Sequence, residues 1–127
     1  MPYLRIVCRE DCGNAPRKAL LRDFHVALAD GDLDAALAWL SDSVVWEWVG
    51  EKTAAGKAEA AEALRAVPPV EELIIEAIIT HGAHAAAHGT FTSAQGVTSG
   101  FCQVYRFESA GRQAKIKSVK SYVIRLE

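Results

Sequence analysis

The character of the sequence changes at Pro68-Pro69, and this change constrains the fold more than any other feature. Two consecutive prolines end a helix, because proline lacks the backbone N–H that a helix interior needs. Beyond them, runs rich in β-branched and aromatic residues alternate with short turn sequences, a pattern typical of antiparallel hairpins. The runs are EELIIEAIIT, AHAAAHGTFT, VTSGFCQVYRF and AKIKSVKSYVIRLE, separated by HGA, SAQG and ESAGRQ. The second half therefore predicts a meander of four strands.

The first half of the chain carries helical patterns instead. A first helix is expected to begin near Asn14, a capping residue, and Pro16, which suits a first helical turn. It should end at Asp30-Gly31. Its apolar stripe consists of Leu20, Leu21, Phe24, Ala27 and Leu28.

Further segments complete this half. Residues 32–40 predict a second, shorter helix, residues 41–50 a strand, and residues 55–67 an alanine-rich third helix. We expect residues 1–14 to form an N-terminal arm or edge strand and residues 15–127 to form one domain. Helices collected early and strands collected late indicate an α+β fold, with three N-terminal helices packed on a mostly antiparallel sheet.

Composition excludes several classes of function. Hydrophobic residues make up 50% of the 127-residue chain, enough for a buried core. The net charge is −2, from 14 basic and 16 acidic residues, so no positive excess predicts a nucleic-acid partner. No segment reaches the apolar length of a membrane span, and the N-terminus lacks the apolar core of a signal peptide. We therefore expect neither nucleic-acid nor membrane partners.

The cysteines and histidines predict no metal site. Three cysteines (Cys8, Cys12 and Cys102) cannot all pair within one chain, and a domain of this size needs no disulfide. A reduced, cytoplasmic setting is the simplest account of them. His84 and His88 share one face of a strand, but their spacing keeps them too far apart to converge on zinc. We expect no metal and no cofactor.

The run LIIEAIIT, residues 73–80, is apolar on both faces and therefore needs cover on both. One face should carry Leu73, Ile75, Ala77 and Ile79, and the other Ile74 and Ile78. Three helices cover one face of a sheet, so the outer face predicts a homodimer. Phe101, Tyr105 and Tyr122 are the aromatic residues expected at that interface. The alternative is that such residues pack under the N-terminal arm.

Two segments, ALADGDLDAALAWLSDSVVWEWVG and VYRFESAGRQAKIKSVKSYVI, resemble the nuclear transport factor 2-like superfamily. The resemblance is strongest to the branch of the ketosteroid isomerases and the SnoaL-like polyketide cyclases, and it covers residues 16–127. It also includes a D-x-V-x-W strand and an AGK before the third helix. It implies a strongly curved sheet, a conical apolar pocket and dimers through the outer face of the sheet. Because the superfamily holds enzymes, binding proteins and assembly modules, the fold does not fix the activity.

The ketosteroid isomerases place a general-base aspartate in the first strand, three residues before the glycine that ends it. The resemblance assigns this position to Glu47. It places Phe24 where the family has its oxyanion-hole tyrosine and Gly100 where the family has a protonated acid, so steroid isomerisation by that mechanism is not expected. Glu47 could still act as a base in an apolar pocket, where desolvation raises the pKa of a carboxyl group. The other interpretation is an outward-facing glutamate on a short strand, or one in an ion pair.

The same resemblance implies the other pocket residues. They are Phe24, Gly100, Cys102, Val104, Val119, Ser121 and Val123. Cys102 is expected to fill space rather than to react. His88 or His81 is a candidate acid–base group near the pocket rim.

Three functions follow as hypotheses. The first is acid–base isomerase, cyclase or hydrolase chemistry on a small apolar ring compound, with Glu47 as the base. The second is non-catalytic binding of a small hydrophobic ligand, which the missing oxyanion donors indicate. The third is a dimeric interaction module that uses the aromatic outer face. The expected partners are a small apolar molecule and a second copy of the chain.

Overall fold

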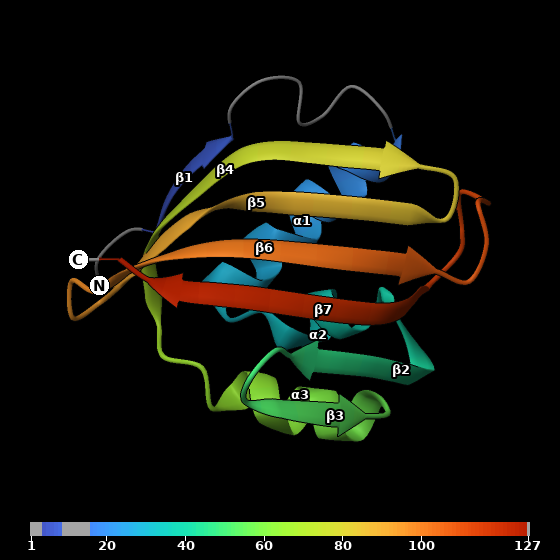
Figure 1. The fold of residues 1–127 in the computed structure, drawn as a ribbon, viewed down its shortest axis with the longest axis horizontal. Helices are drawn as coiled ribbons and strands as arrows, with labels where there is room; N and C mark the ends of the chain where they lie inside the picture. The colour runs from blue at the N-terminus through green and yellow to red at the C-terminus, as the bar shows by residue number, and fades with distance from the viewer. Residues whose placement is uncertain (1–3, 9–15, 127) are drawn as a thin grey trace.

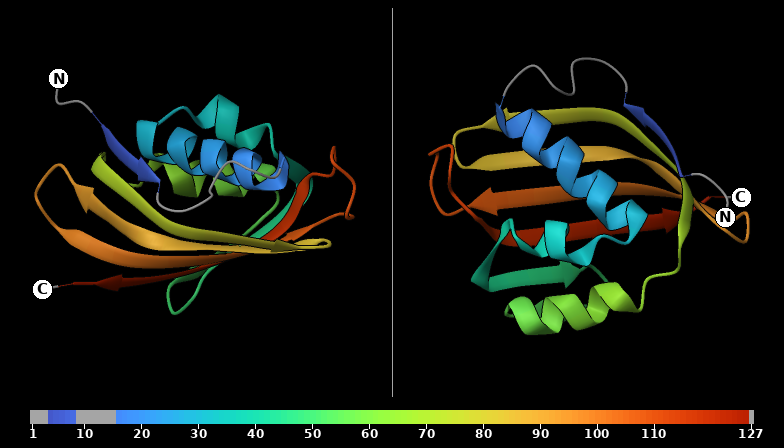
Figure 2. Two further views of the ribbon diagram at one scale, coloured as in Figure 1. Left: turned by 90° about the horizontal axis from the view of Figure 1, so that it is seen from above. Right: turned by 180° about the vertical axis from the view of Figure 1, so that it is seen from behind.

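A curved sheet of seven strands carries three helices on its concave face (Figure 1 and Figure 2). The computed structural model describes residues 4–8 and 16–126. In chain order the elements are β1 (Arg5–Cys8), α1 (Pro16–Asp30), α2 (Leu33–Leu37), β2 (Leu40–Trp48), β3 (Lys52–Ala55), α3 (Lys57–Arg65), β4 (Val70–His81), β5 (His84–Ser93), β6 (Thr98–Phe107) and β7 (Ile116–Arg125). The α+β class predicted from the sequence is confirmed.

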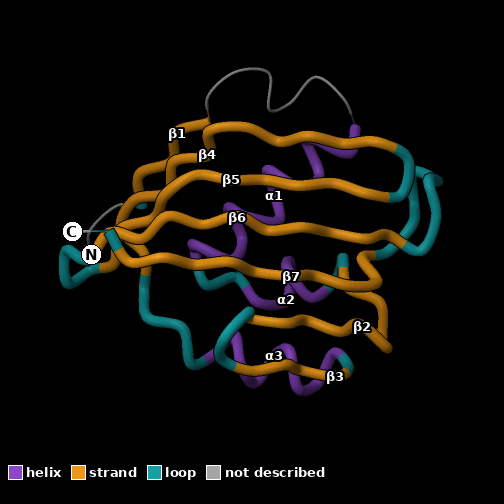
Figure 3. Tube along the Cα trace, in the orientation of Figure 1, coloured by secondary structure: helices purple, strands orange, loops and turns teal. Residues whose placement is uncertain are grey.

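The strands follow the order β1-β4-β5-β6-β7-β2-β3 across the sheet (Figure 3). The four strands β4 to β7 form the antiparallel meander that the sequence predicts, and β3 pairs antiparallel with β2. Two pairs, β1 with β4 and β2 with β7, are parallel. The glycines of two hairpin turns, Gly82 and Gly96, have φ of +60° and +84°, a conformation that residues with a Cβ rarely adopt.

The helices differ from prediction mainly at α2. Helix α1 runs from Pro16 to Asp30, as expected, and Gly31 ends it with φ of +78°. The Asp32 side chain caps α2 by accepting a hydrogen bond of 3.2 Å from the Ala35 N–H. Because β2 already begins at Leu40, α2 is shorter than residues 32–40 suggested. Helix α3 follows β2 and β3, so of the three helices grouped as N-terminal only α1 and α2 precede β2.

The hydrophobic core lies between α1 and the concave face of the sheet. Trp46, Tyr105 and Phe24 are its largest wholly buried side chains. The Phe24 ring centroid lies 6.0 Å from that of Trp46 and 6.1 Å from that of Tyr105, within the range of favourable aromatic pairs. Phe24 thereby fixes α1 against β2 and β6, and this contact places the next residue, His25, over the sheet.

Arg17 holds the other end of α1 against two turns of the sheet. Its guanidinium donates to the Gly82 carbonyl at 2.7 Å and to the Gly111 carbonyl at 2.6 Å. The same group lies 4.0 Å from the centre of the Phe107 ring, a cation–π geometry. The β4–β5 turn and the β6–β7 connection, far apart in sequence, are thus tied to one helix.

A β-bulge in β4 changes the faces predicted for that strand. The pairing with β5 shifts register between Ile75 and Ala77. The extra residue reverses the alternation beyond it, so the concave face receives Ile78 and the outer face Ala77 and Ile79. The prediction that Ala77 and Ile79 share a face with Ile75 is therefore wrong. Both faces of β4 are nonetheless apolar.

Gly89 lies opposite the start of the bulge, where β5 approaches β4 closely. A Cβ atom added at Gly89 would lie 1.8 Å from the carbonyl oxygen of Ile74. No side chain fits at that distance, so the close approach of the two strands requires glycine here.

Cys8 is disulfide-bonded and Cys102 is a free thiol. The expectation that the cysteines are all reduced is therefore wrong for Cys8. No helix within residues 4–8 and 16–126 combines the length and apolar character needed to cross a bilayer.

Candidate functional site

A cavity of about 920 Å³, partly open to solvent, lies between the helices and the sheet. This volume falls in the range of small-molecule sites in proteins. Leu28 of α1, Leu64 of α3 and Leu73 of β4 form an aliphatic part of its wall. Phe91 and Phe101 add aromatic surface from β5 and β6. The wall is thus mainly apolar.

His25, Tyr105 and Gln103 form a hydrogen-bonded chain beside this cavity. The Tyr105 hydroxyl donates to Gln103 Oε1 at 2.6 Å, and its oxygen is also paired with Nε2 of His25. A hydroxyl has one proton, so Nε2 of His25 is the donor in the second hydrogen bond. His25 and Gln103 line the cavity, whereas Tyr105 is wholly buried behind them.

This tautomer leaves Nδ1 of His25 as a lone-pair acceptor. Nδ1 has no hydrogen-bond partner among the described residues. The single wholly buried side-chain nitrogen or oxygen without a partner, within that part of the chain, is Ser41 Oγ. Nδ1 of His25 is therefore not a wholly buried unpaired atom, and His25 is a residue of the cavity wall.

The two ionisable side chains of this hydrogen-bonded network, His25 and Tyr105, are neutral at pH 7. Burial lowers the pKa of His25 from 6.5 to about 4, because the charged imidazolium loses its hydration. Burial also raises the pKa of the Tyr105 hydroxyl well above 10.0. The network therefore acts through the direction of its hydrogen bonds and carries no charge.

Trp46 and Trp48 form another wall of the cavity. Their ring centroids lie 5.0 Å apart with an angle of 8° between the planes, a stacked pair. The Trp46 indole Nε1 donates to Ser121 Oγ at 2.9 Å, so the buried indole N–H is satisfied. Ser121 Oγ keeps its own proton as a further donor.

The charged residues that line the cavity lie toward solvent. Asp30, Glu51, Lys52 and Arg65 are exposed, and Glu71 is half-buried. Lys52 places its Nζ 5.5 Å from the centre of the Trp48 ring. The buried floor, by contrast, presents the neutral groups of His25, Gln103 and Ser121.

Glu47 does not line this cavity. It pairs with Lys120 in the β2–β7 register, and its Oε1 lies 3.9 Å from the Lys120 Nζ. The two side chains are 40% and 57% exposed. Trp46 and Trp48, on either side of Glu47, lie on the cavity side instead. The predicted inward position of Glu47 is therefore wrong, and the structure agrees with the interpretation of an outward-facing, ion-paired glutamate.

The faces predicted for β6 are also reversed. Gly100, Cys102 and Val104 were expected on the pocket side, but they lie on the outer face, with Val104 41% exposed. Phe101 and Tyr105 were expected at an outer dimer interface, but they are buried on the concave side. Because side chains alternate along a strand, one wrong face assignment reversed the whole set.

The remaining predicted residues divide into two groups. Val119, Ser121 and Val123 lie on the concave side of β7, and of these Ser121 and Val123 line the cavity. Phe24 is core and does not reach the cavity wall. His88 is exposed on the outer face of β5, so its predicted place at the pocket rim is wrong.

Two residues of the polar network, His25 and Gln103, were not predicted. His25 follows Leu21 by four positions and precedes Leu28 by three, so helical spacing places it on the apolar face of α1. Gln103 lies between Phe101 and Tyr105 on the same face of β6. A polar residue embedded in an apolar stripe was the available signal for both.

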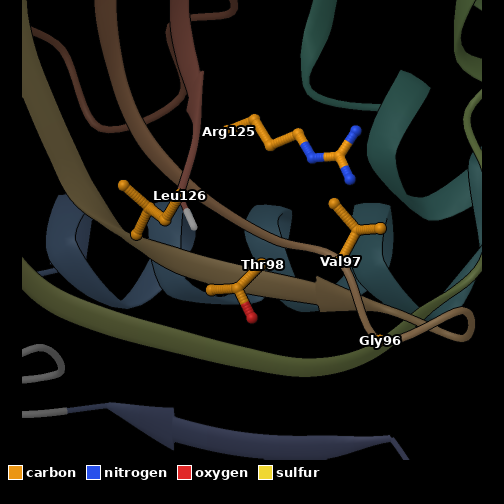
Figure 4. A pocket seen from close by; sticks show the side chains of 5 residues that line it. All are labelled: Gly96, Val97, Thr98, Arg125 and Leu126. Atoms are coloured by element: carbon orange, nitrogen blue, oxygen red, sulfur yellow. The ribbon is translucent and has the colours of Figure 1, made fainter.

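A second, smaller hollow of about 630 Å³ lies where the β5–β6 turn meets the end of β7. Figure 4 shows the residues that line it: Gly96, Val97, Thr98, Arg125 and Leu126. Arg125 is the one charged side chain among them. No group of three or more potential metal ligands occurs within residues 4–8 and 16–126.

Solved structures with this fold include proteins with several names. An NTF-2 like protein of unknown function from Burkholderia xenovorans superposes with a TM-score of 0.74 at 14% identity, covering 88% of this chain and 85% of that one. A candidate ketosteroid isomerase from Kribbella flavida gives 0.73 at 13% identity, over 93% and 84% of the two chains. An LEH-like epoxide hydrolase from M. tuberculosis gives 0.65 at 24% identity, over 83% and 80%. At these sequence identities, the similarity shows that the proteins share a fold and does not extend to their activities.

A comparison with curated protein sequences finds no match. The sequence model of the SnoaL-like domain matches residues 21–116, which span α1 to the start of β7. The chain therefore belongs to the SnoaL-like domain family.

Proposed function

We propose that this protein binds a small, mainly apolar molecule in the cavity between α1 and the concave face of the sheet. The observation that carries the proposal is the cavity of about 920 Å³, which has an apolar wall and an uncharged polar floor. Apolar walls supply most of the binding free energy in such sites, and a few polar groups fix the orientation of the ligand. His25 and Gln103 are the groups placed to do so.

A test of binding compares two tryptophan substitutions on the same strand. Val123 lines the cavity, whereas Lys120 lies on the outer face of β7. Val123→Trp should fill the space and abolish uptake of an uncharged fluorescent probe such as N-phenyl-1-naphthylamine, and Lys120→Trp should leave uptake unchanged. Unfolding temperatures of both variants control for loss of the fold. Equal probe binding by the wild type and Val123→Trp would contradict the proposal.

A second candidate function is acid–base chemistry on the bound molecule, with His25 in the role first expected of Glu47. The observation that favours it is that His25 lines the cavity and that its Nδ1 has no hydrogen-bond partner among the described residues. A screen of ring compounds with acidic C–H or O–H groups would test it. Turnover should be lost in His25→Phe and kept in His84→Phe, which alters an exposed histidine on β5. Equal turnover in the two variants would exclude His25 as the base.

We also propose that the outer face of the sheet pairs with a second copy of the chain. The support is the apolar exposed set on that face: Ile79, Val104, Tyr122 and Ile124, which are 64%, 41%, 43% and 69% exposed. Contiguous exposed apolar surface is typical of interaction sites. Sedimentation velocity should show a dimer that Ile124→Glu dissociates and that Val49→Glu, in the β2–β3 turn, leaves intact. A wild-type monomer at micromolar concentration would contradict this proposal. The cytoplasmic location expected from the sequence stays a prediction.

A further inference from the structure

We propose that the cavity selects uncharged, flat ring compounds that carry a hydroxyl or N–H group, and that this group donates a hydrogen bond to Nδ1 of His25. The inference rests on the proposed function, since it names the class of molecule that the same cavity would take.

The floor of the cavity is a row of side chains across three neighbouring strands. Trp48 of β2 lies opposite Ser121 of β7, which in turn lies opposite Gln103 of β6. Ser121 is much smaller than Trp48, so the row has a high wall at β2 and a low centre at β7. His25 reaches this region from α1, with its ring 5.3 Å from that of Phe101. A ligand above Ser121 would therefore lie between an indole and an imidazole.

The hydrogen bonds of the network decide which polar group fits. Tyr105 gives its proton to Gln103 Oε1, so His25 must give its Nε2 proton to Tyr105 and keeps a lone pair on Nδ1. A lone pair in an apolar cavity needs a donor from the ligand, and a hydroxyl or N–H supplies one. An ether or ester oxygen at the same place would face the lone pair and leave both acceptors without a proton.

Gln103 complements this requirement with the opposite polarity. Its Oε1 is engaged by Tyr105, and its amide NH2 retains two donors. No hydrogen bond of that NH2 group occurs within the described residues. A hydroxyl group offers both polarities, because it can donate its proton to His25 and accept one from Gln103. The floor thus matches a phenol-type group more closely than a bare carbonyl.

The charge of the floor excludes ionised ligands. His25 and Tyr105 are neutral, and the cationic side chains along the cavity, Lys52 and Arg65, are exposed at its outer part. A carboxylate placed on the floor would lose its hydration and meet the Nδ1 lone pair, without a counter-ion to offset the loss. A neutral hydroxyl avoids both costs.

The shape of the walls favours a flat ring. Trp46 and Trp48 stack with 8° between their planes and present aromatic surface from β2. Phe91 and Phe101, with centroids 6.2 Å apart, present aromatic surface from β5 and β6. A planar ring that enters between these walls can make stacked or edge-to-face contacts with either.

Isothermal titration calorimetry at pH 7 with three naphthalene probes tests the inference. The probes are 2-naphthol, 2-methoxynaphthalene and 2-naphthoate, which share the ring and differ in the group offered to the floor. We expect 2-naphthol to bind about 10-fold more tightly than the ether, because the ether leaves a buried acceptor unpaired. The naphthoate should bind more weakly than either. Equal affinities of naphthol and ether, or tighter binding of the naphthoate, would overturn the inference while leaving the proposed function intact. Absence of binding by every probe would count against both.

Two variants locate the selectivity. In His25→Phe, a ring of similar size without nitrogen, the naphthol and ether should bind with affinities within about 2-fold of each other, since the acceptor that favours the naphthol is gone. His84→Phe, on the outer face of β5, should keep the wild-type preference. A naphthol preference that survives His25→Phe would overturn the assignment to His25. If a variant does not fold, the titration of the wild type with the three probes still tests the inference by itself.

Discussion

Acidification should destabilise this protein through His25. Burial lowers the pKa of His25 from 6.5 to about 4, so between these values the unfolded chain binds a proton that the folded chain does not. Stability therefore rises with pH across this window and is lost as the pH falls from about 6.5 toward about 4. The ionisable side chain that contacts the imidazole is Tyr105, which is neutral throughout this range. The sign of the effect thus follows from desolvation of the imidazole.

The size of the effect follows from the two pKa values. A difference of this size corresponds to about 3 kcal/mol of unfolding free energy between neutral pH and pH well below 4, since each pKa unit is worth about 1.4 kcal/mol. At pH 5, where the folded imidazole is still mostly neutral, the loss amounts to about 2 kcal/mol. A loss of this size is a large fraction of the stability of an ordinary domain.

Urea unfolding followed by tryptophan fluorescence at pH 5 and pH 7 measures this loss. Removing the titrating group in His25→Gln should remove about 2 kcal/mol of the difference between the two pH values, whatever the variant's absolute stability. The matched control His84→Gln, at an exposed site, should keep the wild-type difference. NMR titration of the imidazole carbon resonances would give the pKa of His25 directly. Parallel stability profiles of wild type and His25→Gln, or a His25 pKa near 6.5, would refute the reasoning.

Three further predictions concern the scaffold of the site, each measured by urea unfolding against the wild type. Ser121→Ala should cost about 1–3 kcal/mol, because it leaves the buried Trp46 indole N–H without an acceptor, and a Thr substitution should recover part of this loss. Gly89→Ala should cost about 3 kcal/mol, since its Cβ would lie 1.8 Å from the Ile74 carbonyl oxygen; a neutral result would mean that β4 and β5 separate freely. Arg17→Ala should cost about 1–2 kcal/mol through two lost hydrogen bonds, whereas Arg17→Lys should lose less; an unchanged midpoint for Arg17→Ala would show that the turns hold without it.

The order of elements was predictable because its signals are local. Pro16 and Gly31 mark the ends of α1, and Pro68-Pro69 separate the last helix from the meander. Each of these residues restricts the backbone by itself, independent of distant contacts. Strand β3, only four residues long, carries no comparable signal and was missed.

The faces of the strands were harder to assign because alternation fixes only relative positions. Along β2 it requires that Glu47 oppose Trp46 and Trp48, but it does not say which set points inward. The resemblance to the ketosteroid isomerases assigned Glu47 to the pocket. Burying two indoles stabilises the fold far more than burying one carboxylate, which costs free energy unless it is paired. This comparison of free energies selects the observed orientation.

The bulge in β4 has a different origin. Residues 73–79 are apolar except for Glu76, so the sequence of this strand has no alternation that would reveal the register shift between Ile75 and Ala77. The shift becomes intelligible only with Gly89 of the partner strand, whose missing side chain allows the backbones to approach. Because the register shift depends on residues of both strands, the sequence of either strand alone does not predict it.

The orientation of β2 and the neutral state of His25 depend on each other. With Glu47 on the outer face beside Lys120, the imidazole has no carboxylate to stabilise its charged form, so desolvation alone sets its pKa. Had Glu47 pointed inward, a nearby negative charge would have raised that pKa and favoured an imidazolium–carboxylate pair. Such a pair would present a charged floor to the ligand. The observed face of β2 therefore leaves the floor uncharged, which is the condition for the proposed recognition of ligands by hydrogen-bond direction.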